Sequence, residues 1–195
     1  MSAMKRKLAL LLGLLSTNAV MAFDAAGVEP PVLTDGHQNS SGKGCSAIRA
    51  LKPAELPQPW RSAVTEIVMK CEPMEGVDKE PDAATNTVAI LRPGAVSLRG
   101  IPVVELRHGA SWAGDDVQHV LDAPYAKVAQ TIAAYVRARC SAAFGPGARI
   151  SDSCDPVFDS GDGGFFVKTS ETGGTYFHPD PDNPRRSILA VAWSE

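Results

Sequence analysis

One segment restricts the fold more than any other, because it has the pattern of an amphipathic helix. In residues 123–143, apolar side chains recur every three or four positions, which places them on one stripe of a helix. The stripe comprises Tyr125, Val128, Ile132, Tyr135, Val136 and Cys140. Pro124 suits the first helical turn, and the Gly-Pro-Gly run at 145–147 ends the helix. Such a helix needs a sheet or a second helix to cover its apolar face, so this segment predicts a layered fold.

Segments on both sides of the helix have the β-branched content or the alternation of strands. They are residues 61–71, 87–91, 101–107, 164–169, 174–177 and 187–193. Strands and helices do not alternate regularly along the chain, so the pattern gives no sign of parallel strands joined by helical crossovers. The sequence therefore predicts an α+β fold, with a mostly antiparallel sheet of about five strands and one main amphipathic helix packed on a face.

Two regions look like loops. Residues 72–86 hold two prolines, one glycine and five acidic residues, a composition typical of solvated turns. Residues 108–120 contain two glycines and two adjacent aspartates, and we expect turns there as well.

The first 22 residues have the pattern of a signal peptide. Three basic residues at 5–7 precede an apolar run at 8–15, and Val20-Met21-Ala22 supplies the small residues of a cleavage site. The run is shorter than the roughly 20 residues that span a bilayer. We expect a signal peptide over 1–22, a flexible lead-in over 23–44 and a single α+β domain over 45–195. The mature protein would be periplasmic or secreted, with no membrane span after leader cleavage.

Charge argues against nucleic acid as a partner. The formal net charge is −3, and removal of the three basic leader residues would take it to −3 − 3 = −6. A mildly acidic exported domain has no electrostatic reason to bind a polyanion.

The chain has four cysteines, Cys45, Cys71, Cys140 and Cys154, all beyond the predicted leader. An even number in an oxidising compartment predicts two disulfides, for which three pairings exist. Sequential pairing, Cys45 with Cys71 and Cys140 with Cys154, is favoured because each pair flanks one local unit. Structural zinc sites bring thiolates in close pairs such as C-x2-C, and no such spacing occurs here.

The most suggestive polar cluster comprises His108, Asp115, Asp116 and His119, within a dozen residues. An imidazole oriented by a carboxylate can act as a general base, and two imidazoles with a carboxylate can bind a transition metal. The same residues are also ordinary surface composition for a polar loop. No nucleophile elbow, phosphate-binding glycine loop or metalloprotease motif accompanies them.

Asp155, Asp159 and Asp162 are candidate calcium ligands, since they place oxygens close together on a loop. They do not follow the spacing of a calcium-binding helix–loop–helix, and aspartate is also a common turn residue. The sequence therefore predicts no bound metal and no cofactor.

These observations favour an exported, soluble, non-catalytic domain that binds another macromolecule, as an inhibitor, immunity-type or accessory protein does. Trp112 is the predicted contact, because it is a large aromatic residue in a turn-rich setting and tryptophan is enriched among binding anchors. The alternative is a small exported hydrolase or metal-dependent enzyme that uses the segment from His108 to His119.

Overall fold

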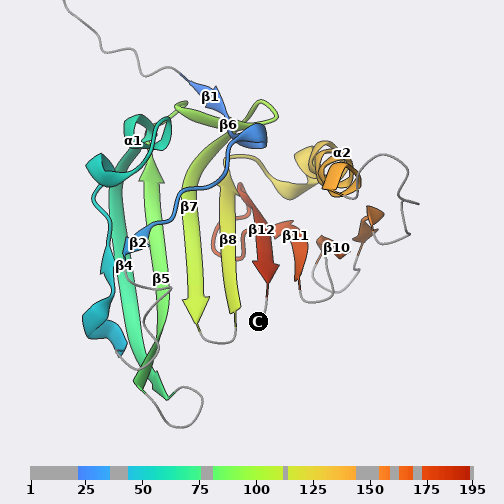
Figure 1. Cartoon of the computed structure of the whole chain (residues 1–195). Coiled ribbons are helices and arrows are strands. Elements are labelled where there is room, and N and C mark those ends of the chain that lie inside the picture. Colours follow the sequence, from blue (N-terminus) through green and yellow to red (C-terminus); the bar gives the residue numbers. More distant parts are fainter. Residues whose placement is uncertain are drawn as a thin grey trace, which may run out of the picture.

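The structure is a computed structural model, and it describes residues 22–35, 44–75, 81–111, 114–143, 154–158, 163–168 and 173–193. Within these ranges, ten strands form one main sheet and two short strands form a second (Figure 1). The main sheet contains β1 (Phe23–Asp24), β4 (Val64–Glu75), β5 (Pro81–Leu91), β6 (Val96–Leu98), β7 (Ile101–Ser111), β8 (Gly114–Leu121), β9 (Val157–Phe158), β10 (Phe165–Lys168), β11 (Gly173–Pro179) and β12 (Ser187–Trp193). The small sheet pairs β2 (Thr34–Asp35) with β3 (Arg49–Ala50).

Eight of these strands lie side by side in the order β4-β5-β7-β8-β12-β11-β10-β9, and all their pairings are antiparallel. The first residues of β7 pair instead with β6, which pairs in parallel with β1. The last strand in the sequence, β12, therefore lies in the interior of the sheet between β8 and β11.

The predicted α+β fold with a sheet of about five strands is wrong. About half of the described residues are strand, 51%, and 24% are helical, so the protein is mostly sheet. Two of the errors concern long segments, and the short strands β1, β6 and β9 were not predicted either. Residues 72–86 are not a loop, since β4 continues to Glu75 and β5 begins at Pro81. Residues 108–120, where we expected turns, are mostly strand, since β7 continues to Ser111 and β8 extends over Gly114–Leu121.

Both errors have the same physical reason. The side chains of residues 72–75 are exposed, so this part of β4 exists through its backbone pairing with β5 and not through burial. In β8, Asp115 and Asp116 are poor strand formers, but the strand is hydrogen-bonded on both edges, by β7 and by β12. Strand propensity depends on the neighbouring strands, which the sequence pattern alone does not reveal.

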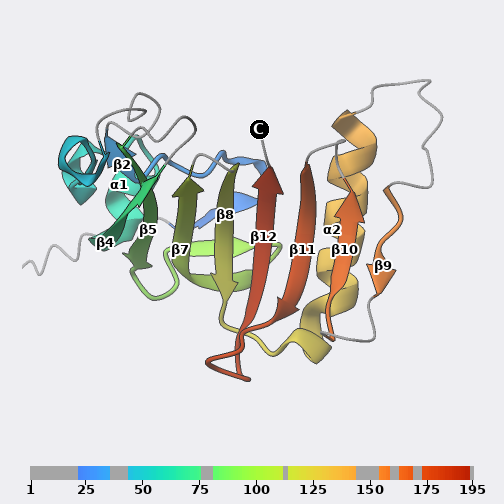
Figure 2. The same cartoon turned by 90° about the horizontal axis from the view of Figure 1, so that it is seen from below.

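The predicted helix is present as α2 (Tyr125–Ala143) and packs on one face of the sheet (Figure 2). Its buried residues are Ala129, Ile132, Ala133, Val136 and Cys140. They share one core with sheet residues such as Phe177 and Leu189, and the Tyr125 ring lies 5.1 Å from the Phe177 ring. No helix of the described part of the chain has the length and hydropathy needed to cross a membrane.

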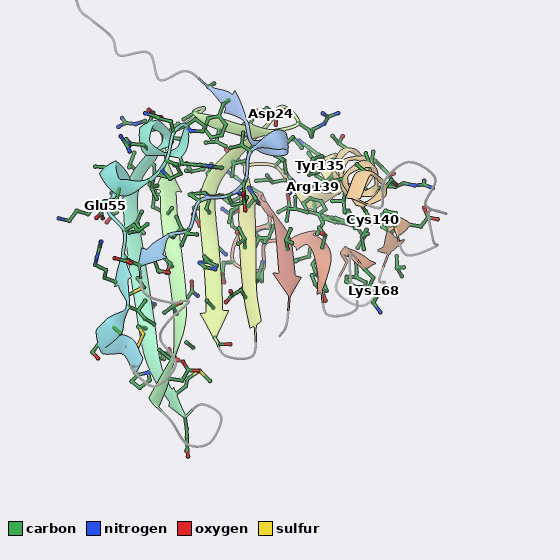
Figure 3. The ribbon with its side chains drawn as sticks, viewed as in Figure 1. Asp24, Glu55, Tyr135, Arg139, Cys140 and Lys168 are labelled. Carbon is green, nitrogen blue, oxygen red and sulfur yellow. A yellow bond between two sulfur atoms is a disulfide. The ribbon has the colours of Figure 1, made fainter. Side chains whose placement is uncertain are left out.

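The N-terminal segment covers the remainder of the same face. Of the range 23–44 expected as a flexible lead-in, residues 23–35 and 44 are described, and Ala25 and Leu33 are buried in the main core. The Asp24 carboxylate, labelled in Figure 3, accepts hydrogen bonds from the backbone N–H of Ala26 and of Arg99. These residues therefore belong to the folded body, whereas 36–43 lie outside the described residues.

Four short helices belong to this layer, η1 (Ala25–Gly27) within the N-terminal segment, η3 (Gly44–Ala47), η4 (Pro53–Glu55) and α1 (Trp60–Ala63). Trp60 is fully buried at the start of α1, and its indole N–H donates to the carbonyl of Glu29 at 2.9 Å. This hydrogen bond holds the N-terminal segment against the rest of the fold, although Trp60 follows Glu29 by 31 positions in the sequence.

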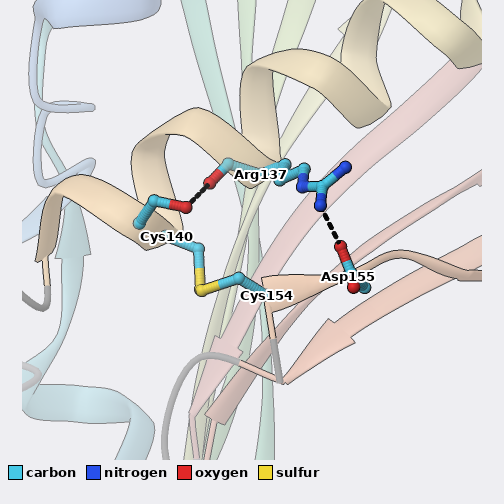
Figure 4. The surroundings of a disulfide bond; sticks show 5 residues. Arg137, Cys140, Cys154 and Asp155 are labelled. Carbon is cyan, nitrogen blue, oxygen red and sulfur yellow. Dashed lines mark hydrogen bonds and ion pairs between the residues drawn. A yellow bond between two sulfur atoms is a disulfide. The ribbon is translucent and has the colours of Figure 1, made fainter. Parts of the chain in front are cut away.

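The two predicted disulfides are confirmed, with the sequential pairing. Cys45–Cys71 joins η3 to β4, and Cys140–Cys154 joins the last turns of α2 to the residue before Asp155 (Figure 4). The second bond is accompanied by an ion pair of 2.7 Å between Arg137 and Asp155, both of which are exposed. Such an exposed pair contributes little to stability.

We expect Cys140→Ser with Cys154→Ser to lower the free energy of unfolding by about 3 kcal/mol, since the bond closes a short loop. The sequence separation of the two cysteines is 14. Urea unfolding of the oxidised protein and of the double variant measures the difference. Alkylation of the unreduced protein checks that both disulfides are formed at the start. A free thiol in the native protein would contradict the assignment.

Candidate functional site

The predicted polar cluster lies on the hairpin of β7 and β8, where strand register decides which side chains meet. His108 is paired with Val117, and His119 is paired with Leu106, so both imidazoles lie on the face that α2 covers. Asp115 shares that face, opposite Ala110. The structure therefore brings three of the four predicted residues to one side of the sheet. His108 is a diagonal neighbour of both Asp115 and His119, at about 7–8 Å, whereas Asp115 and His119 are four positions apart on the same strand, about 13 Å.

Asp116 points to the opposite face. It is paired with Gly109, and a Cβ on that glycine would overlap the carboxylate. Its Oδ2 accepts a hydrogen bond from the side-chain amide of Gln118. Among the described residues, no three His, Cys, Asp or Glu side chains form a group able to hold a metal ion. The metal-binding alternative has no support in this part of the chain.

His119 is buried beneath α2. The residue is 7% exposed, and its Nδ1 has no hydrogen-bond partner. Burial, together with the positive charge of Arg139, lowers the pKa of His119 from 6.5 to about 4. The imidazole is therefore neutral at physiological pH.

The remaining predicted site residues lie outside the described part of the chain, except for Asp155. Trp112, the predicted contact, lies outside the described residues, as do Asp159 and Asp162. Asp155 is described, but its carboxylate forms the ion pair with Arg137. The predictions for these positions remain predictions.

A cavity of about 270 Å³ lies between α2, the N-terminal segment and the covered face of the sheet. Its lining includes Val117, His119, Leu189 and Val191 from the sheet, Val136 from α2 and Val28 from the N-terminal segment. Tyr135, Arg139 and Cys140 of α2 also line it, and Figure 3 labels all three. Most of the lining is apolar, as in small-molecule sites generally.

The opposite face of the sheet is not covered by any helix of the described chain (Figure 2). We call it the uncovered face. Strand register places one residue from each of eight strands in a single row across it. The row consists of Val68, Val88, Arg107, Gln118, Ala190, Tyr176, Phe166 and Val157.

Both ends of this row are apolar and exposed. Val68 at one end is 48% exposed, while Tyr176 and Val157 near the other end are 44% and 63% exposed. The Phe166 and Tyr176 rings lie 4.7 Å apart, and Phe166 also lies over Gly174, where a Cβ would overlap the ring. Because Gly174 has no side chain, the Phe166 ring on the adjacent strand can lie flat on the sheet.

Charged residues occupy the middle of the uncovered face. Glu105 accepts hydrogen bonds from Arg107 at 3.0 Å and from Arg186 at 3.0 Å. Arg186 comes from the connection between β11 and β12, and Val120, Ile188 and Ala190 form a small buried cluster on the same face. Asp180 in this connection accepts a hydrogen bond from the backbone N–H of Asp182, as turn-forming aspartates do.

Sequence reasoning missed Arg139 and the pair of Phe166 and Tyr176. Arg139 lies outside the apolar stripe of the helix, and only the packing of α2 reveals that it lines a cavity. The alternation within residues 164–169 and 174–177 does predict which residues share a face of each strand. Whether the two rings meet depends on the register between β10 and β11, which the pattern does not contain.

Comparisons with protein families, with curated proteins and with solved structures found no match to this chain.

Proposed function

We propose that this chain is an exported, non-catalytic protein that binds another protein, and that the uncovered face of the sheet is the contact surface. The observation that supports the proposal is the row of side chains on this face, with exposed apolar residues at both ends. Single exposed apolar residues are common on protein surfaces, but a contiguous group such as Tyr176, Phe166 and Val157 is typical of an interaction site. Tyrosine and phenylalanine are enriched in such sites.

The size of the face supports the same conclusion. Neighbouring strands lie about 4.8 Å apart, so a row across eight strands extends over roughly 34 Å. A specific interface buries about 800 Å² on each partner, which corresponds to a patch about 28 Å across. The uncovered face is therefore wide enough for an ordinary protein–protein interface. Its charges are mixed in sign, and no basic stripe favours nucleic acid.

Export is part of this proposal. The basic and apolar pattern of residues 1–22 is typical of a cleaved leader, and two disulfides are compatible with an oxidising compartment. An inhibitor, an immunity-type protein or an accessory subunit of an exported complex would have these properties.

The enzyme alternative has one observation in its favour. His108, Asp115 and His119 lie on the same face, and Oδ1 of Asp115 and Nδ1 of His119 are buried without a hydrogen-bond partner. Against it, burial lowers the pKa of His119 to about 4, so this imidazole is a poor base near neutral pH. Loss of a measurable turnover in His108→Ala would favour the enzyme.

We expect Tyr176→Ala to weaken binding of the partner by about 2 kcal/mol, or roughly 30-fold in Kd, which is the usual scale of an aromatic hot spot. A photo-crosslinker at position 176 identifies the partner in an extract of the exported proteins, and titration with that partner measures the change. Val32→Ala is the matched control, since Val32 is 57% exposed but lies in the N-terminal segment.

Thermal unfolding should show nearly equal stability for the wild-type protein and for both variants. Trp112→Ala tests the contact predicted from the sequence, and we expect a similar loss of affinity without loss of stability. Equal affinity of wild type and Tyr176→Ala would argue against the uncovered face as the contact surface.

A further inference from the structure

The cavity between α2 and the sheet has a mostly apolar lining, and its polar side chains are either cationic or neutral. Apolar side chains, valine and leucine foremost, form most of its lining, and no acidic residue of the described chain belongs to it. Among the described residues of the lining, Arg139 is the only charged side chain, and His119 and Tyr135 are the only other titratable groups. A ligand carboxylate at this end of the cavity would be attracted by Arg139, and an ammonium group would be repelled by it.

Arg139 is held in place at this site. Its Nη1 donates a hydrogen bond of 3.0 Å to the hydroxyl of Tyr135, and that hydroxyl donates to the carbonyl of Ala26 at 3.3 Å. No described carboxylate forms an ion pair with Arg139, whereas Arg137, one half-turn earlier on the helix, is paired with Asp155. The guanidinium therefore has donors left for an anion.

The second indication of a ligand is His119. Its side chain is more than nine-tenths buried, lines the cavity and makes no hydrogen bond to any residue that the structure describes. A buried polar group without a partner is costly, because it has lost its hydrogen bonds to water. A ligand that presents a hydrogen-bond acceptor to this imidazole would remove the cost.

We propose that this cavity binds a small monocarboxylic acid with an apolar body. Its carboxylate accepts hydrogen bonds from Arg139 and from the imidazole of His119, and its hydrocarbon part packs against Val117, Leu189 and Val191. A dry cavity of roughly 150 Å³ accommodates benzene, so a cavity of about 270 Å³ is suited to a ligand of about ten non-hydrogen atoms. Octanoate has this size and this chemistry.

This site is separate from the uncovered face, because the two lie on opposite sides of the sheet. Failure of either proposal therefore leaves the other unaffected.

Titration of the oxidised protein with octanoate tests the inference, with isothermal calorimetry for affinity and methyl NMR for location. We expect saturable binding of one molecule, with shifts concentrated on the methyl groups of Val136, Leu189 and Val191. Arg139→Gln should weaken octanoate binding at least tenfold, and n-octylamine, which has the same chain and the opposite charge, should not bind.

Arg137→Gln is the matched control, because it removes the same charge from an exposed position of the same helix. We expect it to change the affinity for octanoate by less than twofold. Arg139 is also exposed, so its replacement should leave the fold intact. The proposal is overturned if octanoate does not saturate a site, if Arg139→Gln binds it as tightly as wild type, or if n-octylamine binds equally well.

Discussion

Ile132→Asp should prevent the protein from folding, with a loss of more than about 4 kcal/mol in the free energy of unfolding. Ile132 is 0% exposed and lies in the middle of the buried side of α2. The substitution removes a large apolar side chain and places a carboxylate in the core, where the described neighbours are apolar. The carboxylate must either be protonated or force the helix away from the sheet. Circular dichroism and urea unfolding measure the effect.

Gln130→Asp is the control for this substitution. Gln130 is exposed on the other side of the same helix, two positions earlier, so the same new charge stays in water. We expect a change in stability within about 0.5 kcal/mol. Equal destabilisation by both variants would mean that helix propensity, and not burial against the sheet, decides the stability of α2.

Lowering the pH from 7.5 to 4 should destabilise the protein by about 3 kcal/mol through His119 alone. The pKa of this imidazole is lowered from 6.5 to about 4, first by burial and second by the charge of Arg139. Between these two values the unfolded chain binds a proton at His119 and the folded protein does not. Because the unfolded state binds more protons, stability falls as the pH falls through this range.

Urea unfolding of wild type and His119→Leu at several pH values isolates this contribution. The variant retains the carboxylates that also titrate in acid, so the difference between the two proteins reports the imidazole. We expect the stability of the wild type relative to His119→Leu to fall by about 3 kcal/mol between pH 7.5 and pH 4. His178→Gln, on the other face of the sheet, should keep the pH dependence of the wild type. Parallel curves for wild type and His119→Leu would contradict the assignment.

The sequence by itself determined the features that depend on neighbours along the chain. The spacing of Tyr125, Ile132 and Val136 predicted α2 and its buried side, because a helix satisfies its own backbone hydrogen bonds. The pattern of residues 187–193 predicted a strand, and β12 occupies these positions. The order of four cysteines along the chain sufficed to favour the pairing that is observed.

Only the tertiary structure decided the size of the sheet and the composition of the sites. A strand satisfies its backbone through other strands, so β8, with Gly114, Asp115 and Asp116, becomes a strand because β7 and β12 supply partners on both edges. The same pairings separate Asp116 from His119, although the two residues lie close together in the sequence. They also align Val68, Tyr176 and Val157 on one face. Register is a long-range property, and a shift of one residue would move each of these side chains to the opposite side of the sheet.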